Sequence, residues 1–248
     1  TSGSLVLDGG ILQTAADLNL GTRSATITNN NGTIDSANTI TIDGKIDGDG
    51  QLVKSGTGTL KLTGANTYTG STNVNAGTLE INNENALGSS QQINLNNTTL
   101  AITDNATINA QVNLTNGGVI NTSTSNKTTT INGLITGTGG LQKNGAGTLV
   151  LTSDNTYTGN TYINQGMLGI NKNSNLGDAN NQTFLNGGSL QTLQDMVLDQ
   201  NLAITAAQGG IDTAGNNTVV NGVVSGDGSG SGSVVVSVVV VLLLLLLL

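Results

Sequence analysis

Three aspartates in the segment IDGKIDGDG offer the clearest potential for chemistry, because Asp43, Asp47 and Asp49 lie close together. Closely spaced carboxylates with intervening glycines are typical of calcium-binding loops. The segment occurs twice more in the chain, where the equivalent residues are Asn132, Thr136 and Thr138, and then Asn221, Ser225 and Asp227. A turn tolerates this loss of carboxylates and a calcium site does not. We therefore expect turns here and predict no metal ligands.

Catalytic groups are also scarce in the rest of the chain. The absence of His and Cys excludes Ser-His-Asp and Cys-His arrangements, imidazole metal sites and a histidine general base. The 15 Asp and Glu residues are spread singly through predicted turns, whereas sugar cleavage needs a pair of carboxylates that flank the scissile bond. We predict no catalytic residue, no cofactor-binding residue and no cofactor, and we keep a β-helical polysaccharide lyase or hydrolase as an alternative.

Charge and composition narrow the remaining classes of function. The chain has a net charge of −8, and its seven Lys and Arg residues are scattered singly. Binding to nucleic acid needs clusters of basic residues, so we predict no nucleic-acid partner. The first ten residues also lack the basic region and the apolar stretch of a signal peptide. Aromatic residues make up 2% and charged residues 9% of the chain, which contains 36 Gly. This composition favours a narrow, elongated core built from many short strands.

The chain is organised around one stretch that occurs twice, at 48–88 and 137–177, with an offset of 89 residues and no gap. The positions shared by the two copies are mostly Gly, Leu, Thr and Asn, with one Tyr. Leu60 and Leu62 alternate with polar residues, as do Leu79 and Ile81, so we expect them and their equivalents 89 residues later to face inward from β-strands. Strands this short must stack on neighbouring copies of the same coil, which is typical of a solenoid.

The 89-residue period continues beyond the central stretch, and the chain holds about two and three-quarter copies of it. Coils of roughly 20–25 residues would place about four coils in each period and form a rod roughly 50 Å long. Helices are not expected as the main element, because Asn, Thr and Gly are poor helix formers. We expect Tyr68 and Tyr157, at matched positions, to pack over a coil corner; an exposed binding stripe is the alternative.

The repeat pattern breaks at Ser229. We therefore predict one β-helical unit at 1–228 and a separate tail at 229–248, which is rich in Gly and Ser and then in Val and Leu. The apolar run at 234–248 is shorter than the ~20 residues that a membrane-spanning helix needs. We interpret the tail as outside the native fold; a C-terminal membrane anchor is the alternative.

The two copies contain a recognisable motif, K-x-G-x-G-x-L-x-L followed by N-x-Y-x-G-x-T and G-x-L, at 54–81 and 143–170. This motif resembles the passenger-associated transport repeat of autotransporter proteins. The Asn- and Thr-rich segments between the copies are similar to the rickettsial surface antigens of the outer-membrane protein B type. The resemblance implies an all-β fold, a right-handed single-stranded parallel β-helix, in a passenger domain of a Gram-negative bacterium that is displayed on the cell surface or secreted.

The resemblance also implies a function and a set of partners. The chain is expected to be a fragment of a surface-displayed stalk or adhesin-like module, whose transport repeats assist secretion and folding. Expected partners are a host-cell surface or an extracellular protein, and the C-terminal outer-membrane β-barrel of the same protein, which this chain does not include. No small-molecule substrate is expected, and the motif contains no catalytic residue. A self-associating module that clumps cells is a second alternative.

Overall fold

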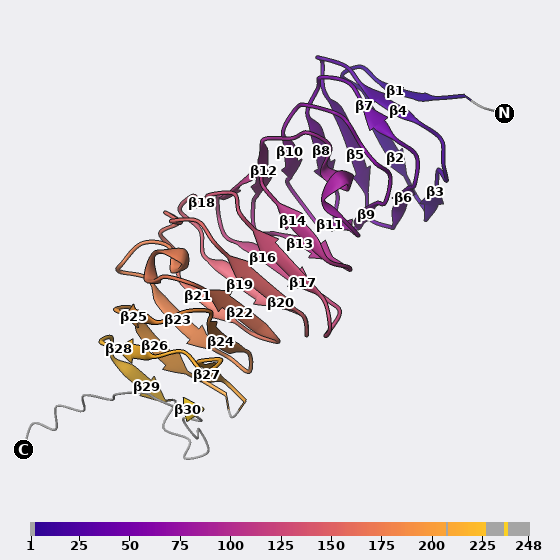
Figure 1. The fold of residues 1–248 in the computed structure, drawn as a ribbon. Helices are drawn as coiled ribbons and strands as arrows, with labels where there is room; N and C mark the ends of the chain where they lie inside the picture. The colour runs from indigo at the N-terminus through magenta and orange to yellow at the C-terminus, as the bar shows by residue number, and fades with distance from the viewer. Residues whose placement is uncertain (1–2, 207, 227–235, 238–248) are drawn as a thin grey trace, which may run out of the picture.

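The computed structural model describes residues 3–206, 208–226 and 236–237. Short parallel strands stack into an elongated solenoid, and the chain passes from one end of the rod to the other without turning back (Figure 1). One sheet of eleven strands extends through the whole rod, with one strand from each turn: β3 (Leu18–Asn19), β6 (Ile40–Ile42), β9 (Thr59–Leu62), β11 (Thr78–Ile81), β13 (Thr98–Ile102), β16 (Gly118–Thr122), β19 (Leu141–Asn144), β21 (Thr161–Ile163), β23 (Gln182–Leu185), β26 (Asn201–Ile204) and β29 (Val224–Gly226). The predicted parallel β-solenoid is confirmed.

Four further sheets form the other faces of the rod. The second sheet contains β2 (Ile11–Thr14), β5 (Gly32–Ser36), β8 (Leu52–Ser55), β10 (Thr72–Val74), β12 (Gln92–Leu95), β15 (Gln111–Leu114) and β18 (Ile135–Thr136). The third contains β14 (Ala106–Ile108), β17 (Thr128–Ile131), β20 (Thr148–Leu151), β22 (Met167–Ile170), β24 (Ser189–Thr192), β27 (Gly210–Asp212) and β30 (Val236–Ser237). The two short sheets contain β1 (Leu5–Leu7), β4 (Ala25–Ile27) and β7 (Ile46–Asp47), and β25 (Met196–Leu198) and β28 (Thr218–Val220).

Helical structure in the described residues is limited to two single 3₁₀ turns, η1 (Glu84–Leu87) and η2 (Asn173–Leu176). They occupy equivalent places, since each lies at the end of one copy of the central repeat. None of the described helices has the length and apolar character to cross a bilayer. Apart from β30, the predicted tail at 229–248 lies outside the described residues, so the interpretation of the tail and the boundary at 228 stay predictions.

The core is a column of stacked aliphatic side chains. Leu60, Leu62, Leu79 and Ile81 are fully buried, and so are their equivalents Leu149, Leu151, Leu168 and Ile170. Leu60 is aligned with Leu79 in the next turn, and Leu79 with Leu100 in the turn after that. The predicted inward face is therefore confirmed. Glycine is required at the corner before Leu60, because a Cβ atom on Gly58 would lie 2.1 Å from the backbone oxygen of Asn38.

The two copies of the repeat lie on different faces of the rod. Leu60 belongs to the eleven-stranded sheet, whereas its equivalent Leu149 belongs to the sheet that begins at β14. Four turns along the eleven-stranded sheet lead from Leu60 to Lys143, and six more residues carry the chain round a corner to Leu149. The 89-residue unit is thus four turns plus one face, rather than the four turns expected from the sequence.

This geometry makes a deletion of residues 52–140 a test of the repeat unit. The deletion joins Gln51 to Leu141, which stands one period after Leu52. The sequence that follows the junction therefore has the same residue pattern as the sequence that it replaces. We expect the shortened chain to fold into a rod about 20 Å shorter, since four turns at ~4.8 Å each are removed. Circular dichroism and small-angle X-ray scattering measure both properties. Loss of the β-sheet signal would show that the unit is not interchangeable.

Candidate functional site

Each copy of the central repeat buries one lysine, and these two residues, Lys54 and Lys143, are called the corner lysines below. They occupy inward positions of β8 and β19, and their side chains are 1% and 0% exposed. Lys54 Nζ donates hydrogen bonds to the backbone oxygens of Ser55 (2.6 Å), Gly56 (2.6 Å) and Ala76 (3.3 Å). The third acceptor belongs to the next turn, so the ammonium group connects two turns at a corner.

The second corner lysine repeats this arrangement. Lys143 Nζ donates to the backbone oxygens of Asn144 (2.9 Å), Gly145 (2.7 Å) and Gln165 (3.0 Å). An ammonium group has three donors, and three acceptors are supplied here. Neither corner lysine was predicted from the sequence to have a role. A signal was available, because a lysine stands at an inward, alternating position in both copies, two residues after Leu52 and Leu141.

In each copy, a buried tyrosine lies at a different corner from the lysine, just before the strand β10 or β21. Tyr68 and Tyr157 are fully buried, as predicted for packing over the corner rather than for an exposed stripe. Their hydroxyl groups form hydrogen bonds with the hydroxyls of Thr72 (2.8 Å) and Thr161 (2.6 Å). Burial raises the pKa of both phenols well above the ordinary value, so both stay neutral and act as hydrogen-bonding groups only.

An asparagine then ties three successive turns together. The Asn66 side chain accepts a hydrogen bond from the backbone nitrogen of Ile46 (2.7 Å) and donates one to the backbone oxygen of Ala86 (2.6 Å). Asn155 makes the equivalent pair of hydrogen bonds with Ile135 and Asn175, at 2.8 and 2.6 Å. Asn66 lies between β9 and β10, and Asn155 between β20 and β21. In the structure they replace backbone pairing at a place where the chain forms no strand.

The two corner lysines differ in their electrostatic surroundings. Burial lowers the pKa of both, to about 8 for Lys143. The charge of Asp35 counteracts burial at Lys54. Asp35 lies on β5, next to β8 in the sheet, and is aligned with Ser55, the residue after Lys54. Asn121 has the equivalent place on β16, where it is aligned with Asn144, the residue after Lys143. A neutral amide therefore stands next to Lys143 where a carboxylate stands next to Lys54.

Replacing Asn121 by Asp is expected to raise the pKa of Lys143. With a native pKa of about 8, the native state binds fewer protons than the unfolded chain at higher pH, so the free energy of unfolding should increase as the pH rises from about 8 towards 10.5. Asn121→Asp should flatten this increase, because a carboxylate favours the charged lysine. Urea denaturation across that pH range measures the slope of the free energy of unfolding against pH. An unchanged slope in Asn121→Asp would contradict the claim that the residue at position 121 sets the pKa of Lys143.

The three aspartates singled out in the sequence do not converge. Each carboxylate instead accepts a hydrogen bond from a threonine of a neighbouring turn: Asp43 from Thr63 (2.6 Å), Asp47 from Thr26 (2.7 Å) and Asp49 from Thr69 (3.2 Å). Asp47 also pairs with Lys45 at 3.5 Å. Within the described ranges, no group of three or more acidic, His or Cys side chains is placed to hold a metal ion. The residues therefore serve contacts between turns.

Thermal unfolding should accordingly be independent of calcium. A ligand that binds only the native state raises the melting temperature, so melting curves with added calcium and with a chelator are expected to coincide. Differential scanning calorimetry measures this directly, and Asp49→Asn is the control for any shift. A melting temperature several degrees higher with calcium, lost in Asp49→Asn, would show that the aspartate turn binds the ion.

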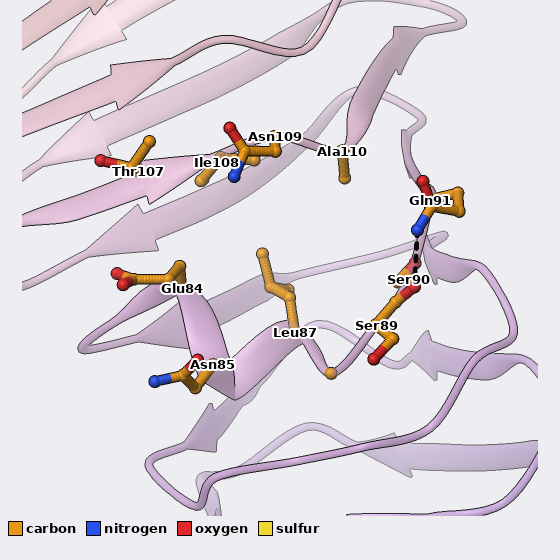
Figure 2. Close-up of a pocket in the computed structure, with 11 residues that line it drawn as sticks. Glu84, Asn85, Leu87, Ser89, Ser90, Gln91, Thr107, Ile108, Asn109 and Ala110 are labelled. Carbon is orange, nitrogen blue, oxygen red and sulfur yellow. Dashed lines mark hydrogen bonds between the residues drawn. The ribbon is translucent and has the colours of Figure 1, made fainter.

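A groove with a volume of about 250 Å³ lies between η1 and β14 (Figure 2). Leu87 points into the groove from one side, and Ile108 and Ala110 lie opposite. Glu84 supplies the one ionisable side chain among the lining residues. Glycoside hydrolysis uses two carboxylates, so this groove does not have the groups for it.

The corner residues coincide with the regions of similarity to known proteins. A family model described as Passenger-associated-transport-repeat matches residues 52–81 and 141–170. The Adhesin BmaC autotransporter of Brucella suis biovar 1 (strain 1330) is 37% identical over 168 residues, which is 66% of this chain and 5% of that relative. The chain therefore corresponds to a small part of the relative's length. No solved structure matches it significantly.

Proposed function

We propose that this chain serves as a stalk and an adhesin-like module. It is part of an autotransporter passenger domain with two passenger-associated transport repeats, displayed on the surface of a Gram-negative bacterium. The observation that carries the proposal is the set of buried polar side chains in each repeat, one lysine, one tyrosine and one asparagine, which fix the turns at three different places. The hydrogen-bonding groups of these side chains are engaged inside the solenoid, by backbone groups or by a threonine hydroxyl, and the role they support is mechanical rather than catalytic.

The contacts of these buried side chains suit a chain that folds as it is exported. Lys54 reaches residues at most 22 positions away, and Asn66 reaches residues 20 positions away on either side. A transport repeat can therefore form as soon as about two turns have emerged, because each turn of a solenoid needs only its neighbours. A folded nucleus outside the membrane would hinder the chain from sliding back. We propose that this is how the repeats assist secretion and folding.

Two partners follow from this proposal. The first is the outer-membrane β-barrel of the same protein, which would anchor the passenger. The second is a surface molecule of a host cell, because the similar Brucella protein is named an adhesin. The solenoid provides long outward faces for such contacts, and its net charge of −8 makes strongly acidic partners unfavourable.

Adherence to host cells tests the adhesin-like role. Bacteria that produce the complete passenger with its barrel are expected to bind cultured epithelial cells more than isogenic bacteria that produce the barrel alone. Equal adherence would contradict the proposal. Cleavage of polysaccharides by the displayed protein would instead support an enzyme, and clumping of bacteria without host-cell binding would support a self-associating module.

A further inference from the structure

The outward face of the eleven-stranded sheet carries two adjacent rows of side chains between β16 and β26. Thr161 and Ile163 of β21 are fully buried, so Tyr162 and Asn164 point outward. One row is aligned by strand pairing and consists of Val119, Gln142, Tyr162, Phe184 and Ala203. The second row consists of the asparagines Asn121, Asn144, Asn164 and Asn186, and these two rows are called the amide–aromatic face below.

Hydrogen bonds between turns fix the amide groups of this face. Asn164 Nδ2 donates to Asn144 Oδ1 (2.8 Å), and Asn186 Nδ2 donates to Asn164 Oδ1 (2.9 Å). Each of these interactions uses one N–H of an amide that has two. The side chains are therefore held in place while each donor keeps a second N–H that the ladder does not use. Such pre-organised donors favour binding, because little rotamer freedom is lost.

The aromatic residues of this face are stacked on each other. The ring centroids of Tyr162 and Phe184 are 4.9 Å apart and the ring planes differ by 12°. Phe184 is the one Phe of the chain and Tyr162 is one of three Tyr, and the other two tyrosines are the buried corner residues. The half-exposed aromatic surface of the chain is thus gathered beside the asparagine row, because Asn164 and Asn186 follow the two aromatic residues by two positions along the chain.

A polar groove runs along the other side of the asparagine row, with a volume of about 680 Å³. Asn121, Asn144, Asn164 and Gln165 contribute to its wall, and all seven lining residues are uncharged. A ligand for this surface should be neutral and should both donate and accept hydrogen bonds. Hydroxyl groups do both, and the C–H faces of a sugar ring match an aromatic surface.

We propose that the amide–aromatic face binds a neutral oligosaccharide, with Asn144 and Asn164 contacting its hydroxyl groups and Tyr162 and Phe184 contacting its apolar C–H surface. The proposal rests on the proposed adhesin-like function for its biological setting and gives that function a ligand class. Acidic polysaccharides are disfavoured, because the lining is uncharged and the chain has a net charge of −8.

The first unit provides an internal control. Its equivalent of Tyr162 is Asn73, which belongs to a ladder of amides alone: Asn73 donates to Gln51 (2.8 Å), Asn94 to Asn73 (2.6 Å) and Asn113 to Asn94 (3.2 Å). This ladder has the hydrogen-bonding groups without the aromatic pair. The substitution Tyr162→Asn therefore gives the second unit the residue of the first, at an outward position where folding should be retained.

Binding is tested with the purified full chain against immobilised neutral hexasaccharides of glucose, mannose and N-acetylglucosamine, with heparin as the acidic comparison. At least one neutral hexasaccharide is expected to bind. Tyr162→Asn and Asn164→Ala should each weaken that binding about tenfold, and Asn94→Ala in the first unit should not change it. Circular dichroism establishes that each variant is folded.

Three results would overturn the proposal: no binding of any neutral hexasaccharide by the folded chain, binding of heparin alone, or binding that is unchanged in Tyr162→Asn. Host-cell adherence of the displayed passenger is measured separately. If adherence persists while the purified chain binds no oligosaccharide, the ligand class is wrong and the adhesin-like function stands. If adherence is absent while oligosaccharide binding is present, the adhesin-like function is wrong and the ligand class stands.

Discussion

Replacing Lys143 by Met is expected to lower the free energy of unfolding by about 3–5 kcal/mol. Methionine keeps the apolar stem, but it removes the ammonium group that donates to the backbone oxygens of Asn144, Gly145 and Gln165. The substitution therefore leaves three backbone oxygens without the ammonium donor, at a corner where the lysine is fully buried. Urea denaturation followed by circular dichroism measures the change.

Lys61→Met is the matched control for this substitution. Lys61 lies one strand from Lys54, and its side chain is 41% exposed and pairs with Glu80 at 2.9 Å. Exposed ion pairs contribute about 0–1 kcal/mol, so Lys61→Met should have a small effect. A loss of stability in Lys143→Met no greater than that of Lys61→Met would show that the corner lysine does not hold the turns together.

The strands and their inward faces could be predicted from the sequence because alternation is a local pattern. Leu60 and Leu62, two residues apart, must lie on one face of any strand that contains them. The internal repeat then shows that the same pattern returns after 89 residues. The rotation of the second copy could not be predicted, because it depends on the length of every turn. Between the two copies, these lengths vary along the eleven-stranded sheet from 19 residues, between Leu60 and Leu79, to 23, between Ile120 and Lys143.

The corner lysines were missed for a different physical reason. Lysine is almost never fully buried, so seven scattered basic residues indicate a solvated surface. The acceptors that make burial favourable are backbone oxygens, one of them 22 residues from Lys54, and only the register of the stacked turns brings them within reach. The same holds for Tyr162 and Phe184, which are 22 residues apart and meet through strand pairing.

The double substitution Gly58→Val and Leu60→Asp is expected to abolish most surface display of the complete passenger. A Cβ atom at position 58 would lie 2.1 Å from the backbone oxygen of Asn38, so the corner cannot form without moving the preceding turn. An aspartate at position 60 would place an unpaired charge in the core, at a cost of about 4 kcal/mol or more. The first transport repeat would then fail to fold when it emerges from the membrane.

A control of equal severity lies between the two repeats. Ile108 is 2% exposed, and a Cβ atom on Gly133 would lie 1.8 Å from the backbone oxygen of Ala110. Gly133→Val with Ile108→Asp therefore creates the same kind of clash and the same kind of buried charge, outside the matched residues 52–81 and 141–170. Any difference between the two double variants reflects the role of the transport repeat rather than general destabilisation.

The most direct test of the transport-repeat account is the accessibility of the passenger to added protease in intact cells, measured at intervals after synthesis begins. The account predicts that Gly58→Val with Leu60→Asp leaves little passenger accessible, with most of the chain retained inside. It predicts that Gly133→Val with Ile108→Asp reaches the surface in clearly larger amounts. Equal accessibility of the two double variants, at early and late times, would contradict the account and make the transport repeats ordinary turns of the stalk.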